Sequence, residues 1–201
     1  MTVRMSWDDR FSCDHYVYGE APNAFLARHA SLIPAGARVL VPGDGEGRNG
    51  VWLACQGLHV LSVDSSAVGL EKARRLAARH DVSIETEHAD LTAWAWPEAT
   101  FDAVVSIFLH LPPETAPFIH AAMLQALKPG GLLILQAFRP EQLGYTSGGP
   151  KDVSWLYTSA MLAIDFAKAE ILLNVEEAVS LEEGPLHRGP AATVGLVARR
   201  R

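Results

Sequence analysis

Short apolar runs alternate with stretches of helical periodicity along most of the chain. An apolar run bounded by turn residues is typical of a buried strand, and apolar residues at helical spacing are typical of an amphipathic helix. The predicted strands are 38–42, 59–64, about 83–87, 101–107 and 132–138. The predicted helices are 21–32, about 47–56, about 66–79 and 112–127. This alternation indicates a mostly parallel α/β sheet with helices on both faces.

The last part of the chain departs from this alternation. A Gly-rich loop is predicted at 144–150 and a helix at 153–166. Two further strands are predicted at about 169–180 and 190–199, with 184–190 as the tight connection between them. The pattern therefore predicts a hairpin at the end of an otherwise parallel sheet.

The first predicted strand leads directly into three alternating glycines. Gly43, Gly45 and Gly47 allow a sharp turn and let a ligand approach the backbone closely. The helix that follows offers free N–H groups and a partial positive charge at its start. The second predicted strand ends in Asp64, whose carboxylate is suited to accept both hydroxyls of a ribose. Together these residues predict a pocket for an adenosine-type cofactor.

The glycine spacing also satisfies a dinucleotide-binding pattern, which runs from Gly45 to Gly50. That pattern expects an acidic residue about 20 residues further on, and Asp64 comes early when it is counted from Gly50. Counted from Gly43 the distance is suitable, but Arg48 then stands in place of the third glycine. A nicotinamide-dependent oxidoreductase is therefore the less favoured alternative.

Length and composition bound the fold and the compartment. A chain of 201 residues with 49% hydrophobic residues is long enough for one domain with a substantial core. No apolar run approaches the roughly 18 residues that a membrane helix needs, and residues 1–10 lack the apolar region of a signal peptide. Cys13 and Cys55 make neither a disulfide framework nor a metal-type spacing. We therefore expect a cytoplasmic protein that does not bind a membrane.

The charge pattern limits the classes of binding partner that we expect. The formal net charge is −6 at pH 7, which opposes a general nucleic-acid surface. We interpret Arg74, Arg75 and Arg79 as a solvated helix face, and the basic C-terminus at 199–201 as a solvated tail. The eight histidines are scattered without the spacing of helical metal ligands, so we expect neither a nucleic-acid partner nor a metal. The oligomeric state is not predicted.

Four motifs follow one another over 38–138. They are the glycine segment with Asp64, the acidic Asp90 after the third predicted strand, the segment 101–112, and Lys128-Pro-Gly-Gly131 before an apolar strand. Together they resemble the class I methyltransferases that use S-adenosylmethionine. The resemblance implies a Rossmann-like, seven-stranded, mostly parallel sheet with helices on both faces and an antiparallel last strand. It also implies S-adenosylmethionine as the cofactor.

The same resemblance implies cofactor-binding roles. In this family an acidic residue at the position of Asp90 receives the adenine amino group, and the end of the fourth strand passes beneath the cofactor. An aspartate that only caps a turn is an equally open interpretation of Asp90. The expected cofactor-binding residues are Gly43, Asp44, Gly45, Gly47, Arg48, Asn49, Asp64, Ser65, Asp90, Leu91, Ser106, Ile107 and Phe108.

We expect residues 1–201 to form a single methyltransferase domain. Its expected parts are an N-terminal arm and helix (1–32), a cofactor-binding core (38–138), and a substrate-side loop with the final hairpin (139–201). We hypothesise that the N-terminal arm and the 139–150 loop close over the site and exclude water.

A narrower resemblance covers most of the chain. Gly45-Glu-Gly-Arg-Asn49, Trp7-Asp-Asp-Arg10, the segment 16–23, Gly148-Gly-Pro150 and Leu186-His-Arg188 are similar to small bacterial methyltransferases of the tellurite-resistance type. Tellurite need not be the substrate, because function depends on the site and not on the fold.

One departure from the family pattern concerns the cofactor's ammonium group. The family normally carries an acidic residue two positions before the first glycine, where this chain has Val41. We hypothesise that Asp44 supplies the missing negative charge; an aspartate that only caps the helix is the alternative. The departure also keeps open a catalytically silent S-adenosylmethionine-binding protein.

Methyl transfer from a sulfonium requires mainly position and electrostatics, and a base only where the nucleophile must lose a proton. His110 follows the fourth predicted strand and is a candidate base, with a backbone-bonded loop histidine as the alternative. His187 and Arg188 resemble a substrate-facing pair of tellurite-type relatives, with an exposed turn pair as the alternative. Arg188 is the candidate ligand of an oxyanion. We predict methyl transfer from S-adenosylmethionine to a small molecule bearing a thiol, metalloid oxyanion, carboxylate or hydroxyl.

Overall fold

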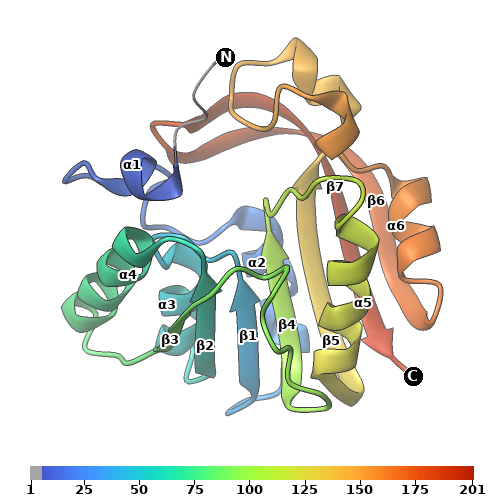
Figure 1. Cartoon of the computed structure of the whole chain (residues 1–201), viewed down its shortest axis with the longest axis horizontal. Helices are drawn as coiled ribbons and strands as arrows, with labels where there is room; N and C mark the ends of the chain where they lie inside the picture. Colours follow the sequence, from blue (N-terminus) through green and yellow to red (C-terminus); the bar gives the residue numbers. More distant parts are fainter. Residues whose placement is uncertain (1–5) are drawn as a thin grey trace.

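Seven strands form one continuous sheet in the computed structural model, which describes residues 6–201 (Figure 1). They lie in the order β3-β2-β1-β4-β5-β7-β6. Neighbours from β3 to β5 run parallel, and β7 runs antiparallel to both β5 and β6. The predicted fold class is therefore confirmed, while residues 1–5 of the expected arm lie outside the described residues. The strands are β1 Arg38–Pro42, β2 His59–Asp64, β3 Glu85–His88, β4 Phe101–Ile107, β5 Leu127–Phe138, β6 Ala169–Gly184 and β7 His187–Arg200.

Four of the α-helices in residues 6–201 begin at a residue whose side chain accepts from a free N–H of the first turn. The Asn23 side chain accepts from the Leu26 N–H at the start of α2, and the Ser66 side chain accepts from the Gly69 N–H at the start of α4. The α-helices are α1 Trp7–Phe11, α2 Ala24–His29, α3 Arg48–Cys55, α4 Ala67–Arg79, α5 Ala116–Ala126 and α6 Ser159–Asp165. Short 3₁₀ helices are η1 Ala30–Leu32, η2 Pro140–Gly144 and η3 Val153–Trp155.

Alternate residues of the central strands face two separate hydrophobic layers. Leu40 and Val104 pack in a core with side chains of α5 and α6, whereas their neighbours Val39 and Val105 pack in a core with side chains of α2 and α3. Successive side chains of a strand point to opposite faces of the sheet, so strands that are apolar at every position need helices on both faces. Figure 1 shows this layered arrangement.

The predicted helix over 153–166 is wrong in its first half. Residues 153–155 form only η3, and α6 begins at Ser159. Between them Tyr157 is buried and its N–H donates to the Phe138 carbonyl oxygen at 3.0 Å. This tertiary contact draws the chain into an extended conformation and interrupts the helix that the local pattern favours.

The final hairpin is longer than predicted. β6 continues to Gly184 and β7 already begins at His187, so the turn is shorter than the predicted 184–190 connection. Pro190 lies outside the part of β7 that pairs with β5, Thr193–Arg199. A proline is tolerated where a strand has no partner on one side. The hairpin therefore extends past the sheet and carries His187 with it.

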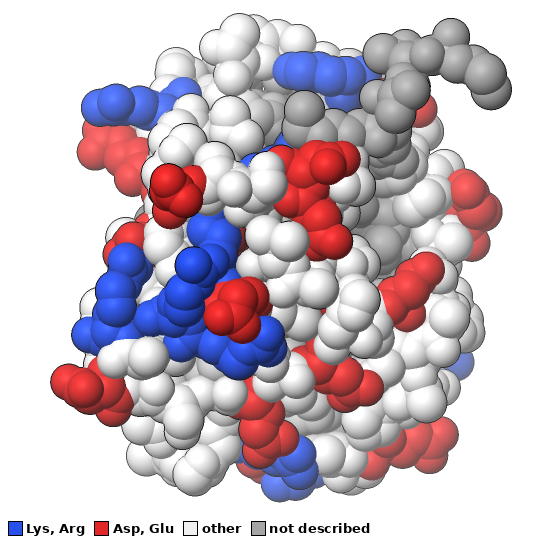
Figure 2. All heavy atoms as spheres, turned by 60° about the vertical axis from the view of Figure 1, so that its left-hand side comes forward, with Lys and Arg blue, Asp and Glu red and all other residues white. Residues whose placement is uncertain are grey.

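The helix α4 presents a charged face. Arg74 pairs with Glu71 at 2.8 Å, Arg79 pairs with Glu20 at 2.7 Å, and Arg75 is exposed. On the side of the molecule where α4 lies, positive and negative side chains are interspersed (Figure 2). These contacts agree with the interpretation of the three arginines as a solvated helix face. Separately, no helix in residues 6–201 is long and apolar enough to span a bilayer.

Candidate functional site

A cavity of about 890 Å³ opens at the carboxyl ends of the central strands. β1 lies between β2 and β4 in the sheet, so the chain changes direction across the sheet at this point. Ligands of open α/β sheets bind in the crevice at such a point. We call the lining drawn from residues 43–49, 64–65 and 90–92 the glycine-loop wall, and the lining drawn from residues 6–19, 107–112, 138, 149–155 and 187 the arm wall.

The glycine loop requires its glycines. Gly43, Gly45 and Gly47 have φ angles of 69°, 58° and 87°, which L side chains rarely adopt. A Cβ atom on Gly47 would also lie 2.4 Å from the Cβ of Ala73 on α4. Gly47 therefore lets α3 begin in close contact with α4, while Gly43 and Gly45 line the cavity.

Asp64 joins the end of β2 to the glycine loop. Its Oδ2 accepts from the Gly45 N–H and its Oδ1 from the Ser66 N–H, both at 2.8 Å. Burial raises the pKa of Asp64, although these hydrogen bonds act in the opposite direction. Each carboxylate oxygen keeps a further lone pair, and the residue lines the cavity. Asp64 is thus suited to accept the two hydroxyls of a ribose.

Asp90 and Leu91 also line the glycine-loop wall. Asp90 Oδ1 accepts from both the N–H and the hydroxyl of Thr92, at 2.9 and 2.8 Å. These bonds with Thr92 lower the pKa of Asp90. Asp90 therefore makes the turn contact that we considered as an alternative, and any contact with an adenine stays a prediction.

Most of the expected cofactor residues come together in the cavity. Asp44, Arg48, Asn49, Ser65, Ile107 and Phe108 line it together with the residues already described. Within the described chain, Gly47 and Ser106 lie outside the lining, because Gly47 packs on α4 and Ser106 is buried within β4. Phe108 has a φ of 54°, and its ring stacks on Phe138 with centroids 4.3 Å apart. A non-glycine residue with positive φ is strained, and such strain is common at functional sites.

Asp44 has the geometry of a helix cap. Its Oδ2 accepts from the Ser62 hydroxyl at 2.6 Å, and its Oδ1 accepts from the Gly50 N–H in the first turn of α3 at 3.3 Å. Burial raises the pKa of Asp44 to about 6. A Cβ atom on Gly50 would lie 2.3 Å from Asp44 Oδ2, so the carboxylate occupies the space left by that glycine. A contact with the cofactor's ammonium group stays a prediction.

His110 is held by the backbone on both sides of its ring. The Phe138 N–H donates to its Nε2 at 3.1 Å, and its Nδ1 lies 2.8 Å from the Trp155 carbonyl oxygen. Nε2 is therefore the unprotonated nitrogen and Nδ1–H is the donor. Burial lowers the pKa of His110 to about 4. With both nitrogens engaged, the prediction that His110 is a base is not supported, and the alternative of a backbone-bonded histidine fits these contacts.

His187 and Arg188 do not act as a pair in this structure. Both lie at the start of β7, where successive side chains point to opposite faces. His187 is 5% exposed and lines the cavity, whereas Arg188 is exposed and lies outside the lining found for residues 6–201. The oxyanion contact of Arg188 stays a prediction, since the exposed side chain does not line the cavity described for residues 6–201.

The arm wall includes Phe11, which no sequence motif indicated, and residues of the Trp7–Arg10 motif and the segment 16–23, to which the sequence analysis gave no catalytic role. The Phe11 ring would lie 3.1 Å from a Cβ on Gly45, so it covers the glycine loop. Arg10 lines the cavity and donates to the Tyr18 hydroxyl at 2.9 Å. The guanidinium also lies over the Trp7 ring at 4.9 Å. These residues precede the first strand and carry no recognisable catalytic spacing.

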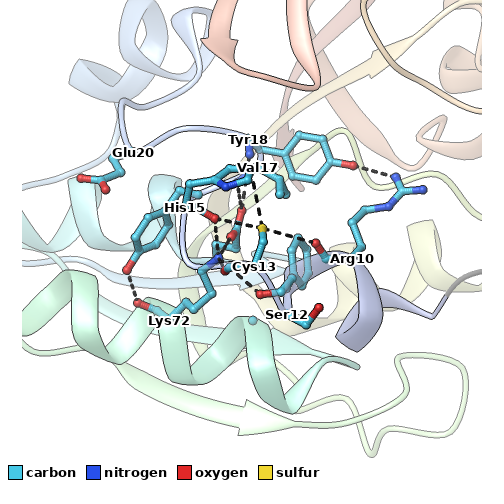
Figure 3. A network of polar contacts seen from close by, with 12 residues as sticks. Arg10, Ser12, Cys13, His15, Val17, Tyr18, Glu20 and Lys72 are labelled. Carbon is cyan, nitrogen blue, oxygen red and sulfur yellow. Dashed lines mark hydrogen bonds and ion pairs between the residues drawn. The ribbon is translucent and has the colours of Figure 1, made fainter.

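A buried ion pair holds this arm in place (Figure 3). The Lys72 ammonium on α4 pairs with Glu46 of the glycine loop at 2.5 Å, and both side chains are 3% exposed. It also donates to the Phe11, Cys13 and His15 carbonyl oxygens. The helical period could have indicated Lys72, since it lies on the same face of α4 as the apolar Leu76 and Gly69.

Glu46 holds the same arm from the glycine loop, so the Lys72–Glu46 pair clamps the arm from two elements. Its Oε2 accepts from the Val17 N–H at 2.9 Å and lies 3.4 Å from the Tyr18 N–H. The Tyr16 hydroxyl donates to the Lys72 carbonyl oxygen at 2.8 Å on the same side. The arm is therefore bonded both to α4 and to the loop that begins α3.

The comparisons with known proteins agree with this geometry. A family model described as "Methyltransferase domain" matches residues 39–131. Demethylmenaquinone methyltransferase of Clavibacter sepedonicus is 36% identical over 105 residues, which is 52% of this chain and 42% of that protein. The 27-O-demethylrifamycin SV methyltransferase of Amycolatopsis mediterranei (strain S699) is 31% identical over 138 residues, 66% of this chain and 49% of that protein. The chain thus spans about half the length of these curated relatives.

The solved structures show the same fold. TehB from Haemophilus influenzae superposes with a TM-score of 0.75 at 23% identity, covering 97% of this chain and 67% of that one. The match over residues 39–131 contains the glycine loop and Asp64, and it replaces the dinucleotide interpretation of the same glycines. The glycines, the acidic strand end and the cavity at the switch point fit S-adenosylmethionine, the cofactor of this family. Residues 39–131 therefore match the methyltransferase domain family, and the chain has the fold of the class I S-adenosylmethionine-dependent methyltransferases.

Proposed function

We propose that this protein transfers a methyl group from S-adenosylmethionine to a small-molecule acceptor through a thiol, metalloid oxyanion, carboxylate or hydroxyl. The observation that carries the proposal is the single cavity of about 890 Å³, which joins the glycine-loop wall to the arm wall. Ligand pockets are commonly about 300–1,000 Å³, so this one lies near the upper end of the range. It has room for the cofactor and a second small molecule.

The glycine-loop wall is suited to the cofactor. Gly43 and Gly45 let the bound molecule approach the backbone, and Asp64 receives the ribose hydroxyls. Next to this wall, Ile107 and Phe108 of the arm wall offer apolar surface at the end of β4. When bound, S-adenosylmethionine supplies an electrophilic methyl group on a positively charged sulfur.

The arm wall is suited to the acceptor. Phe108 and Phe138 provide stacked rings, and the buried His187 lies against them with its centroid 4.8 Å from that of Phe108. The clamped arm covers this side and limits the access of water, which strengthens electrostatic interactions within the site. We assign His187 as the residue that accepts the acceptor's proton when the nucleophile carries one.

Calorimetric titration tests the cofactor assignment. We expect S-adenosylmethionine and S-adenosylhomocysteine to bind with micromolar dissociation constants, NADH not to bind, and Asp64→Ala to remove the binding. Glu114→Ala is the control, because Glu114 is an exposed carboxylate outside the described cavity lining. Binding of NADH in place of S-adenosylmethionine would support the oxidoreductase instead. Absence of both would overturn the proposal.

A catalytically silent binding protein is the second candidate, and the apolar Val41 at a usually acidic position is the observation that favours it. The two candidates differ in the formation of S-adenosylhomocysteine. A panel of thiols, metalloid oxyanions, carboxylic acids and alcohols should contain at least one acceptor that yields it. Tight cofactor binding with no turnover over the whole panel would favour the silent protein.

A further inference from the structure

A buried polar cluster connects the final hairpin to the cofactor loop. Glu183 near the end of β6 accepts from Arg48 at 2.7 Å, and both side chains are 7% exposed. The Asn23 Nδ2 donates to the other oxygen of Glu183 at 2.8 Å. The Nδ1 of His187 lies 3.3 Å from Glu183 Oε2. One carboxylate thus meets a cation, an amide and an imidazole in the interior.

The ionisation of Glu183 determines which nitrogen of His187 is free. Burial raises the pKa of Glu183, but the hydrogen bond with His187 and the charge of Arg48 outweigh it, so its pKa lies below the ordinary value. A carboxylate only accepts hydrogen bonds, so His187 Nδ1 must carry the hydrogen. In the neutral imidazole, Nε2 then holds the lone pair.

The His187 ring belongs to the cavity lining, and its Nε2 lies beside Gly148. His187 lines the cavity, between the rings of Tyr18 and Phe108. A Cβ atom on Gly148 would lie 3.0 Å from Nε2 and 2.6 Å from the neighbouring ring carbon. Glycine at this position therefore keeps space open beside the nitrogen.

We propose that Glu183 is a positioning residue that holds His187 with its Nε2 lone pair directed to the methyl acceptor, and that Arg48 and Asn23 hold Glu183 in turn. The inference rests on the proposed function. It adds Glu183 and Asn23 to the site, neither of which carried a role in the sequence motifs.

Asn23 is itself fixed from three sides. Its Nδ2 donates to Gln136 Oε1 as well as to Glu183, at 2.7 and 2.8 Å. Its Oδ1 caps α2, and its N–H donates to Asn49 Oδ1 at 2.9 Å. This arrangement explains part of the 16–23 segment. Gly19 belongs to the same segment, and a Cβ there would overlap the Glu183 carbonyl oxygen.

Arg48 gives the cluster its link to the cofactor. It is the first residue of α3, directly after the glycine loop, and it lines the cavity. A shift of this loop on cofactor binding would move the cation that holds Glu183. The Arg48–Glu183 salt bridge therefore links the start of α3 to the carboxylate that contacts His187.

The proposed reaction combines a methyl transfer with a proton transfer. The acceptor's nucleophilic atom forms a bond to the methyl carbon as the carbon–sulfur bond breaks, and that bonding pair remains on sulfur. The proton of the nucleophile passes to His187 Nε2, and Glu183 stabilises the resulting imidazolium. His187 later returns the proton to solvent. The products are the methylated acceptor and S-adenosylhomocysteine.

Several charged groups face His187. Burial lowers its pKa, the hydrogen bond with Glu183 raises it, and Arg48 on α3 and Arg10 on α1 lower it. His110, from the loop after β4, and Tyr18, whose ring lies against His187, are further titratable neighbours in residues 6–201. Replacing Glu183 by glutamine removes the anion that stabilises the imidazolium, so the pKa of His187 must fall.

Nuclear magnetic resonance of the histidine ring nitrogens tests the inference without any acceptor. In the wild type we expect the Nδ1–H form of His187, and in Glu183→Gln a pKa lower by about one unit or more with mixed tautomers. Glu182→Gln is the matched control, because Glu182 is the exposed neighbour on the same strand. Glu183→Asp, which keeps the charge, should recover part of the shift. An unchanged pKa and tautomer in Glu183→Gln would overturn the inference.

Two further measurements distinguish the possible outcomes. If Glu183→Gln does not fold, the wild-type tautomer alone decides, because a predominant Nε2–H form contradicts the assignment. Calorimetry with S-adenosylmethionine on the same wild-type sample separates the two proposals. If the wild type does not bind S-adenosylmethionine, the proposed function is contradicted. If the wild type binds it but the pKa and tautomer of His187 are unchanged in Glu183→Gln, only the positioning role of Glu183 is contradicted. With an acceptor in hand, the acidic limb of the kcat/KM profile should move to lower pH with the measured pKa.

Discussion

The glycine-loop wall and the arm wall of the cavity are built in different ways. The first uses backbone geometry within one short stretch, where positive φ angles and the N–H of Gly45 place Asp64 against the loop. The second uses side chains from distant parts of the chain, where Lys72 on α4 holds the arm and Arg48 on α3 pairs with Glu183 on β6. Local backbone geometry thus shapes the glycine-loop wall, whereas tertiary side-chain contacts shape the arm wall.

The largest expected effect comes from breaking the buried ion pair of Lys72 and Glu46, which holds the N-terminal arm. Lys72→Met leaves the Glu46 carboxylate buried without its cation and frees three backbone carbonyl oxygens. Breaking one side of a buried pair costs about 3–5 kcal/mol of the free energy of unfolding. Urea denaturation measures it. Arg74→Met on the same helix removes an exposed pair with Glu71 and should cost less than about 1 kcal/mol. Equal effects of the two substitutions would contradict the account of the arm wall.

The next effect concerns the glycine-loop wall and its pH dependence. Burial raises the pKa of Asp44 to about 6 in the folded chain from 3.8, so the folded state binds the proton more tightly than the unfolded state. Asp44 therefore favours folding at low pH and loses roughly 3 kcal/mol of that contribution as the pH rises from about 4 to about 6. Asp44→Asn should abolish this slope. Denaturant titrations of both proteins across that window check it, and a constant difference between them from pH 4 to 7 would refute the assignment.

A smaller effect separates backbone strain from packing at the loop. Gly47 and Gly57 both have positive φ, but only a Cβ on Gly47 would overlap α4, while Gly57 faces open space. Each alanine substitution carries the left-handed backbone cost of about 1–2 kcal/mol. Gly47→Ala should lower the free energy of unfolding by a further 1–3 kcal/mol or so, because it overpacks the contact with Ala73. Equal losses by thermal denaturation would show that α3 and α4 can separate.

The smallest expected effect lies on the hairpin. Arg188 is exposed and points away from the cavity, so Arg188→Ala should change kcat/KM by less than about threefold. His187→Ala on the adjacent position should lower kcat/KM by roughly 10²-fold or more where the acceptor must lose a proton. Steady-state kinetics on one acceptor compares the two. A large loss in Arg188→Ala would restore the paired role that the resemblance implied.

The same contrast explains what the sequence could predict. The strands at 38–42, 59–64 and 101–107 were predicted with the bounds that the structure shows, because their apolar runs are local signals. The glycine loop and Asp64 were found for the same reason. The break before α6 was missed, because it depends on the contact of Tyr157 with Phe138.

The arm wall shows where local patterns fail. Glu46 lies in the glycine segment and Lys72 on a predicted helix outside the motifs, and only the fold brings them together as a buried pair. His110 and His187 were both candidate bases, since position along the chain does not reveal hydrogen-bond partners. The backbone contacts of His110 and the Glu183 contact of His187 distinguish them. Glu183 lies more than a hundred residues from its partners Asn23 and Arg48, so these contacts have no local signature in the sequence.

We propose that the cavity brings S-adenosylmethionine and a small nucleophile together beside His187. The most direct measurement is the rate of S-adenosylhomocysteine formation with a panel of thiols and metalloid oxyanions, compared between wild type and His187→Ala. The account predicts turnover by the wild type on at least one acceptor and a loss of roughly 10²-fold or more in the variant. Equal turnover by the two proteins would contradict the role of His187. Cofactor binding without any turnover would contradict the proposal that the protein is a methyltransferase.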